Sequence, residues 1–372
     1  MAVVMTSSIS LDRPHVEPRS AARARTRPDR IADDMAMLRA VSELTRDLTP
    51  AKPRVYWTDL LLSCAIGYGA MALAMIVATP WVVALAIAVA ILALYRAGSF
   101  IHELTHIKHS SVPGFRLGWN LLVGVPQLVP SFMYEGVHSL HHARTRYGTA
   151  EDPEYLPLAL MKPWTVPVFV LVSALAPIAL FFRFGILTPL SALFPSVRAV
   201  VVAKYSALAI NPAFRRRAPE GELARQWRWQ AAGASIWAIS LIGLTAVGII
   251  PIKSLLIFIG IASGVMVINQ VRTLVAHLWE NDGGAISTTA QYLDSVNVPP
   301  PGLLPLLWAP VGLRYHALHH LLPGLPYHAL AEAHRRLVSA LGADSLYHQA
   351  NYRSLIGLVV RLIGGSVRRG AA

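Results

Sequence analysis

Charged residues are scarce in this sequence, and their scarcity limits the class of protein. Only 14% of the 372 residues are Asp, Glu, Lys or Arg, whereas 54% are hydrophobic. Soluble domains usually carry about 25% charged residues. The deficit excludes a disordered chain and disfavours an ordinary soluble globule. It predicts a chain whose middle part lies in lipid.

Cysteine is almost absent as well, because Cys64 is the single one in the chain. One cysteine excludes an internal disulfide and any Cys-x-x-Cys metal site. It also excludes a set of cysteines that could hold an iron–sulfur cluster. Metal ligands, if the chain has them, must come from other residue types.

Acidic residues are fewer than basic ones, 20 against 33, which gives a net charge of +13. The basic residues lie outside the apolar stretches, for example between 23 and 30 and at 215–217. This pattern favours contact with anionic lipid headgroups on the cytosolic side of a membrane, with no role in nucleic-acid binding. Solvated loops without a partner are the simpler alternative.

Long apolar runs predict an all-α integral membrane protein with four long transmembrane helices. Two fall in 57–77 and 81–98, and two more lie in 229–271 on either side of Pro251. Each is long enough to cross about 30 Å of hydrocarbon. The segment 163–195 is apolar but contains several prolines, so we expect a short hairpin there, either two short spans or a re-entrant loop.

The remaining chain divides into three predicted regions. Residues 1–30 are expected to form a disordered basic tail, 31–345 the membrane domain, and 346–372 an amphipathic tail. Helical spacing in 31–50, 330–341 and 355–363 predicts helices on the membrane surface. Residues 118–132 are apolar but too short to cross, so they either dip into the bilayer or belong to a buried cap.

Fourteen histidines are present, and nine of them form four groups. The groups are His102-Glu-Leu-Thr-His106, His138-Ser-Leu-His141-His142, the lone His277 and His316-Ala-Leu-His319-His320. Spacings of three and four place imidazoles on one face of a helix, where they can hold a metal. Each group follows an even number of predicted crossings, so all should meet on the cytosolic side. Eight imidazoles exceed the needs of one tetrahedral ion, which predicts two metals.

Two other interpretations of these histidines need to be weighed. His102-Glu103-Leu-Thr-His106 also matches the HExxH motif of zinc proteases, in which Glu103 would be the general base. A protease would not need two further HxxHH motifs. Isolated histidines usually have structural roles, which we expect for His15, His328, His334 and His348. His109 shares a helix face with His102 and His106, so a role as a further metal ligand is the alternative to a structural one.

Together, the three histidine boxes resemble those of the membrane fatty acid desaturase superfamily, in order and in distance from the spans. The flanking residues around 147–154, 291–297 and 323–328 are also similar. The resemblance implies four spans and a cytosolic helical cap that holds two iron ions. The ligands it implies are His102, His106, His138, His141, His142, His277, His316, His319 and His320.

The resemblance also implies the partners of the site. O2 would be the co-substrate, and electrons would come from a separate ferredoxin, rubredoxin or similar protein, because the chain lacks a dinucleotide fingerprint and a fused haem motif. Carboxylates should orient the imidazoles. The candidates are Asp152, Glu154, Asp282 and Asp294, with Thr273 at a position where related desaturases often carry an asparagine.

The expected reaction is the introduction of a cis double bond into an acyl chain carried by a lipid or an acyl thioester. A hydroxylase or ketolase of the same superfamily, acting on an acyl chain, a sphingolipid or a carotenoid, is the alternative. An intramembrane metalloprotease is a remote one. The expected location is a bacterial-type inner membrane, with the active site facing the cytosol.

Overall fold

The computed structural model describes residues 31–370, and the expected tail at 1–30 lies outside the described part. Over these residues the structure is helical, with isolated bridges but no strands. Five helices are long and apolar enough to cross a membrane. They are α2 (Pro53–Ile76), α3 (Pro80–His106), the continuous helix Thr165–Leu193, α10 (Gly221–Ala246) and α11 (Ile252–Leu274). The all-α membrane architecture predicted from the sequence is thus confirmed.

The predicted hairpin within 163–195 is wrong, because this segment forms one long helix. Its parts are α6 (Thr165–Leu171), η7 (Val172–Leu175), α7 (Ala176–Phe182), η8 (Arg183–Leu187) and α8 (Thr188–Leu193). Pro177 and Pro189 each begin a new regular segment after an irregular turn, where a missing N–H costs little. The prolines therefore bend the helix without ending it.

The chain reverses direction after this helix. It turns at Phe194 into α9 (Pro195–Tyr205), which packs against α8. The following loop then returns to the level of the second histidine box, where Leu208 N donates to Met133 O (2.8 Å) and Ile210 N donates to Pro153 O (2.9 Å). The helix and α9 together bring the chain back to the end at which it started, as the hairpin was expected to do.

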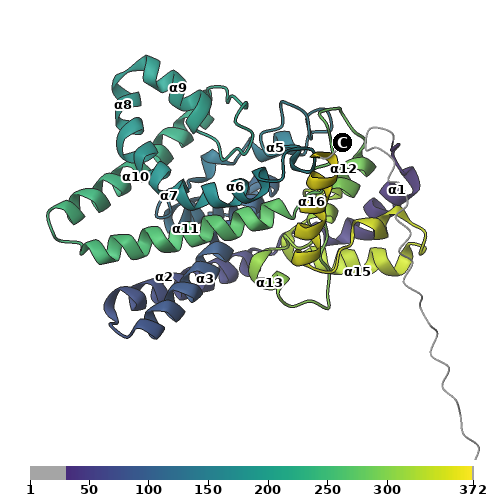
Figure 1. The fold of residues 1–372 in the computed structure, drawn as a ribbon, viewed down its shortest axis with the longest axis horizontal. Helices are drawn as coiled ribbons and strands as arrows, with labels where there is room; N and C mark the ends of the chain where they lie inside the picture. Colours follow the sequence, from purple (N-terminus) through teal and green to yellow (C-terminus); the bar gives the residue numbers. More distant parts are fainter. Residues whose placement is uncertain (1–30, 371–372) are drawn as a thin grey trace, which may run out of the picture.

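Short helices gather at one end of the long ones and form what we call the cap (Figure 1). The cap contains α1 (Met35–Thr45), α5 (His138–His141), α12 (Thr288–Asp294), α14 (His316–Leu321), α15 (Leu330–Ala340) and α16 (Leu355–Gly370). The helices expected in 31–50, 330–341 and 355–363 are therefore present. In the cap core, Met37 and Val41 of α1 pack with Leu330 and Leu337 of α15.

Shorter elements connect these helices. They are η2 (Arg46–Leu48), η3 (His109–Ser111), α4 (Phe115–Trp119), η4 (Asn120–Gly124), η5 (Ser131–Met133), η6 (Leu158–Leu160), α13 (Pro305–Trp308), η9 (Tyr327–Ala329) and η10 (Leu346–Ala350).

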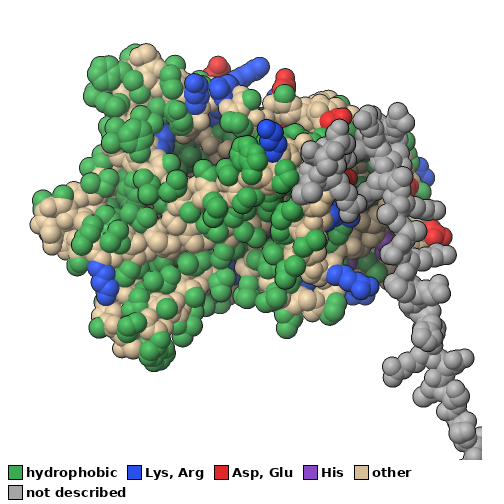
Figure 2. Space-filling model, in the orientation of Figure 1, with side chains coloured by type: hydrophobic (Ala, Val, Ile, Leu, Met, Phe, Trp, Pro, Cys, Tyr) green, Lys and Arg blue, Asp and Glu red, His purple; other side chains and the backbone are tan. Residues whose placement is uncertain are grey.

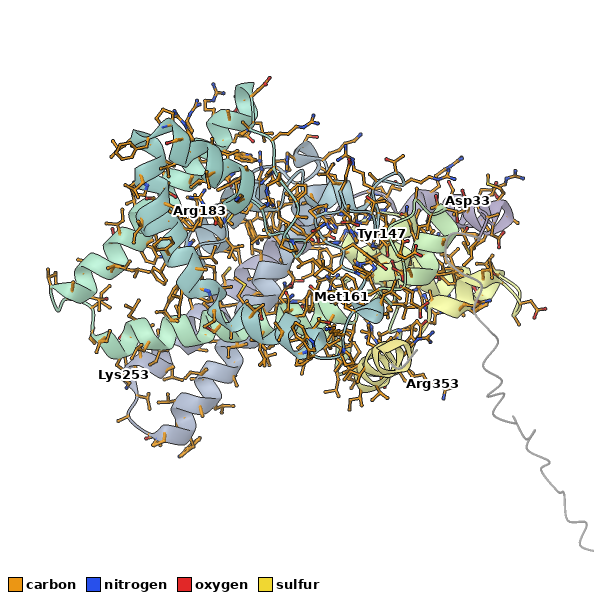
Figure 3. The ribbon with its side chains drawn as sticks, turned by 45° about the horizontal axis from the view of Figure 1, so that its top comes forward. Asp33, Tyr147, Met161, Arg183, Lys253 and Arg353 are labelled. Carbon is orange, nitrogen blue, oxygen red and sulfur yellow. The ribbon has the colours of Figure 1, made fainter. Side chains whose placement is uncertain are left out.

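The outer surface differs between the two ends of the molecule. Figure 2 shows hydrophobic side chains covering the half that contains the long helices, while most visible charges lie toward the cap and along one edge. An exception is Lys253, which marks the far end of α11 in Figure 3. Asp59 of α2 and Arg96 of α3 form an ion pair (2.5 Å) between the helices, so these two charges satisfy each other.

Candidate metal centre

Nine histidines meet where the long helices enter the cap. His102 and His106 occupy the last turns of α3, and His277 follows the end of α11. The other six lie on or directly after the short helices α5 and α14. They form a five-histidine group (His102, His106, His138, His142 and His319) and a four-histidine group (His141, His277, His316 and His320). In each group, the nitrogens that could bind a metal lie within 4.8 Å of one another.

Each HxxHH box divides its histidines between the two groups. His138 and His142 are one helical turn apart and join the five-histidine group, whereas His141 joins the other. The third box does the reverse, because His316 and His320 join the four-histidine group and His319 the five-histidine group. The sequence placed each box on one helix face. The structure adds that a box spans both groups and so places them next to each other.

The spacing of the imidazole nitrogens suits metal coordination. Neighbouring Nε2 atoms are separated by 3.2 Å for His141 and His277, 3.0 Å for His138 and His142, and 3.1 Å for His106 and His319. Two nitrogens about 2.1 Å from one ion lie roughly 3.0–3.4 Å apart at ordinary coordination angles. The observed separations match that range.

Several of these nitrogens have no hydrogen-bond partner although they are buried. His102 is 5% exposed, and neither its Nδ1 nor its Nε2 has a partner among the described residues. The Nδ1 of His320 is in the same state. Leaving a buried polar atom unpaired costs about 1–3 kcal/mol. A metal ion bound at Nε2 would remove part of this cost, so the donor set fits a metal.

Carboxylates contact the outer nitrogens of two histidines, as the sequence led us to expect. Asp152 accepts a hydrogen bond from His141 Nδ1 (2.9 Å), and Glu154 accepts one from His138 Nδ1 (2.8 Å). These contacts put the ring hydrogen on Nδ1 and leave the Nε2 lone pair free for a metal.

Asp294 contacts a histidine only indirectly, through the hydroxyl group of a tyrosine. The Tyr147 hydroxyl donates to Asp294 Oδ2 (2.7 Å), and the hydroxyl oxygen of Tyr147 accepts from His277 Nδ1 (2.9 Å). Tyr155 donates a second bond to Asp294 (2.8 Å). Asp282, by contrast, is exposed, and the structure shows no contact between it and a histidine. Its expected orienting role is not supported by its position.

Backbone groups hold Asp152 in place. Gly148 N donates to its Oδ2 (2.8 Å) and Glu154 N donates to its Oδ1 (2.8 Å). Gly148 has a φ of 69°, and a Cβ added there would lie 2.3 Å from Asn281 Nδ2. Only glycine fits this turn, which brings the loop after the second box against the carboxylate.

Sequence reasoning missed the roles of four residues whose side chains make hydrogen bonds to the nine histidines. They are Tyr134, Tyr147, Arg272 and Ser295. Arg272 donates to His316 Nδ1 (3.0 Å). A neutral His316 therefore carries its hydrogen on Nε2, and binding a metal there requires that hydrogen to move and the Arg272 contact to lengthen. Thr273 lies beside Arg272 and lines a cavity, but makes no side-chain hydrogen bond to a histidine.

Electrostatics favours neutral imidazoles, the form that binds metals. Burial, together with neighbouring imidazoles, lowers the pKa of five histidines well below the usual value. They are His142, His277, His316, His319 and His320. Arg272 adds to the effect on the pKa at His277, His316 and His319. Burial also opposes protonation of His141, but the adjacent Asp152 carboxylate outweighs it and raises the pKa of that histidine.

The contacts of Glu103 do not fit the general base of a protease. Its carboxylate accepts hydrogen bonds from the Tyr56 hydroxyl (2.5 Å) and from Tyr327 N (3.1 Å). It therefore joins α2 and α3 to the cap. This position agrees with the expectation that Glu103 is not a general base.

The isolated histidines lie outside both groups. His109 is exposed and belongs to neither. His328 accepts from Lys52 N, His334 contacts the Tyr347 hydroxyl, and His348 lies against the carbonyl of Gly342. The contacts of His328, His334 and His348 agree with the predicted structural roles. His15 lies outside the described residues.

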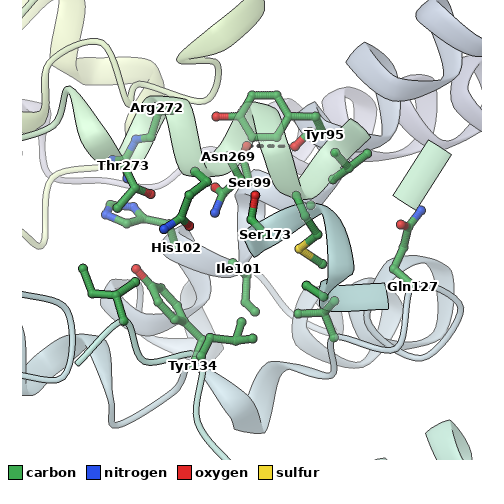
Figure 4. Close-up of a pocket in the computed structure, with 18 of the residues that line it drawn as sticks. Tyr95, Ser99, Ile101, His102, Gln127, Tyr134, Ser173, Asn269, Arg272 and Thr273 are labelled. Carbon is green, nitrogen blue, oxygen red and sulfur yellow. Dashed lines mark hydrogen bonds between the residues drawn. The ribbon is translucent and has the colours of Figure 1, made fainter. Parts of the chain in front are cut away.

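A cavity of about 430 Å³ leads from the five-histidine group toward the apolar parts of the long helices. His102, Tyr134 and Thr273 lie toward one end of it (Figure 4). Glu154 also lines the cavity, and most of the other lining residues are apolar, for example Leu94 and Val265. Trp119, Val123, Gln127 and Val129 also line it. The apolar segment 118–132 thus contributes a wall of the cavity.

The sequence of this chain is similar to characterised proteins. Residues 78–352 match the family described as fatty acid desaturase. A ceramide hydroxylase of Caulobacter vibrioides (strain NA1000 / CB15N) is 50% identical over 323 residues, which cover 86% of this chain and 91% of that relative. The resemblance seen in the histidine boxes is confirmed, and the chain belongs to the fatty acid desaturase family.

Proposed function

We propose that this protein is an oxygen-dependent hydroxylase that acts on ceramide. The observation that carries the proposal is the pair of adjacent histidine groups at the end of a largely apolar cavity. The relative of 50% identity, a ceramide hydroxylase, supports hydroxylation over the desaturation that the sequence first suggested. Hydroxylation was the alternative considered there.

The nine histidines are the proposed ligands of two iron ions. Such a pair supplies the activation of O2 that oxidation of an unreactive C–H bond requires. The chain itself does three things. Imidazoles hold the ions, Asp152, Glu154 and Tyr147 fix the orientation of three rings, and the cap excludes bulk water from the site.

The cavity is the proposed binding site for one hydrocarbon chain of the lipid. Its walls come from α3, α11, the helix Thr165–Leu193 and the segment 118–132, and most of the lining side chains are apolar. A chain held there meets the five-histidine group through His102, which also lines the cavity.

We also propose that the cap faces the cytosol of a bacterial-type inner membrane. Basic residues gather at that end, in the loops around 144–146 and 215–217, in keeping with the positive-inside rule. They would attract a small acidic electron donor of the ferredoxin or rubredoxin type.

The test is lipid analysis of a host that makes ceramide but does not hydroxylate it. Expression of this chain should give ceramide that has gained one oxygen atom, and His141→Ala should abolish the product, whereas His334→Ala should not. Purified protein should contain two irons per chain. Ceramide that has lost two hydrogens would restore the desaturase interpretation, and unchanged lipids together with stoichiometric zinc would overturn both.

A further inference from the structure

Three helices contribute small polar side chains to the middle of the cavity. Asn269 lies on α11, Ser99 on α3 and Ser173 on η7, and all three line the same space. Figure 4 shows them near one another, between His102 and the apolar part of the cavity. Polar residues within membrane-spanning helices are costly and usually face a functional site.

The hydrogen-bonding state of these residues leaves capacity for a ligand. The Ser99 hydroxyl donates to Tyr95 O (2.8 Å) and the Ser173 hydroxyl donates to Val170 O (2.6 Å). Both oxygens can still accept a bond. The Asn269 side chain is exposed to the cavity and has no hydrogen-bond partner among residues 31–370.

Asn269 is also close to the histidine groups along its helix. Thr273, one turn later, lines the same cavity, and His277 follows three residues after the helix ends at Leu274. One turn of four residues corresponds to about 6 Å along the axis. A polar group bound at Asn269 would therefore lie near the site of oxidation.

We propose that Asn269 binds the amide group of the sphingolipid substrate, with Ser99 and Ser173 as additional acceptors. This inference rests on the proposed function and names the part of the substrate that the cavity recognises. The carboxamide oxygen of Asn269 can accept a hydrogen bond from the N–H of a substrate amide. Because the N–H and the carbonyl of a trans amide point in opposite directions, one side chain pairs with only one of them at a time. An ester has no N–H and cannot make this bond.

The position of Asn269 has a consequence for the product. Holding the amide at Asn269, in the same cavity as His102, brings carbons near the headgroup to the site and keeps the rest of the chain in the apolar part of the cavity. The new hydroxyl group should therefore lie near the amide and not in the middle of a hydrocarbon chain.

Binding measurements in lipid nanodiscs test the role of Asn269 without relying on turnover. The probes are a fluorescent ceramide and a fluorescent diacylglycerol with the same chains, which differ in the amide. Asn269→Leu, which keeps a similar volume, should weaken ceramide binding roughly fivefold to tenfold and leave diacylglycerol binding within about twofold, because the net hydrogen bond that is lost is the one to the amide N–H, which the ester lacks.

A matched control lies on the same helix. Ser263 of α11 donates to Ala174 O (2.8 Å), next to Ser173, but does not line the cavity. Ser263→Ala should bind both probes as the native protein does. Equal loss of both probes in Asn269→Leu, or ceramide binding unchanged from native, would overturn the assignment.

Product analysis separates this inference from the proposed function. If the native protein fails to hydroxylate ceramide, the proposed function is wrong. If the native protein places a hydroxyl near the amide and Asn269→Leu does so with unchanged KM, only the role of Asn269 is wrong. We expect a raised KM and a product mixture with hydroxyl groups at several positions.

Discussion

At the scale of single residues, the carboxylate of Asp152 holds the site most directly. It is fully buried and accepts bonds from one imidazole and two backbone N–H groups. Asp152→Asn leaves the shape but removes the charge that stabilises the ring hydrogen of His141 on Nδ1. We expect the affinity for iron to fall about 10-fold to 100-fold, measured as metal per chain after dialysis against a chelator.

Asp282→Asn is the control for this change. The substitution is the same, in a neighbouring part of the cap, but Asp282 is exposed. Native metal content in Asp282→Asn and reduced content in Asp152→Asn are both expected. Equal metal content in the two variants would show that His141 needs no carboxylate.

Tyr147 lies between His277 and Asp294, and this arrangement leads us to expect that iron retention depends on pH. Burial raises the pKa of Asp294 to about 6, and hydrogen bonds from Tyr147 and Tyr155 oppose that rise. Protonation of Asp294 below about pH 6 should weaken iron retention in the native protein, because a neutral Asp294 no longer supports the contact between Tyr147 and His277. Tyr147→Phe breaks that contact at every pH, so iron retention should already be lower above pH 6 and should fall less as the solution is acidified through pH 6.

Tyr292→Phe removes a buried hydroxyl of the same kind from the cap core, where it donates to Tyr347 O (2.5 Å), away from the histidines. Its retention profile should follow that of the native protein. The link through Tyr147 would be refuted by identical profiles for the two variants.

The histidines themselves could be predicted from sequence, but several of their partners could not. Spacings of three and four identify His138, His141 and His142 because a helix repeats at that interval. Tyr147 and Arg272 reach the site from a loop and from a helix end, and no periodic pattern marks them. Their contacts depend on how distant segments pack.

At the scale of helices, the close approach of α3 and α11 depends on a glycine. A Cβ added at Gly264 of α11 would lie 2.4 Å from the Ile91 side chain of α3, whereas one added at Gly260 would meet nothing within 4 Å. Gly264→Leu should therefore force α3 and α11 apart and lower stability by about 1–3 kcal/mol. The midpoint of thermal unfolding in detergent should fall for Gly264→Leu and stay near native for Gly260→Leu.

Four of the five long helices could be predicted from their apolar length alone. The fifth was interpreted as a hairpin because Pro177 and Pro189 read as breaks. In the structure each proline follows an irregular turn and begins the next regular segment, so the helix continues. Whether a proline bends or ends a helix depends on the neighbouring segments, which the local sequence does not contain.

At the scale of the whole molecule, the orientation of the cap can be tested by labelling. In a Cys64→Ser background, Asp344→Cys places a thiol on the exposed surface of the cap and Thr79→Cys places one at the opposite end, between α2 and α3. An impermeant maleimide added to spheroplasts should label only Thr79→Cys. Both should react after the membrane is permeabilised, and labelling of Asp344→Cys alone in intact spheroplasts would reverse the proposed topology.

The distribution of the histidines along the chain has a consequence for biogenesis. Each group draws on segments that are far apart, and both require the third box at His316–His320. Neither pocket can close until the ribosome has released most of the polypeptide and its last span has entered the bilayer. Loading of the proposed irons would therefore be a late step in maturation.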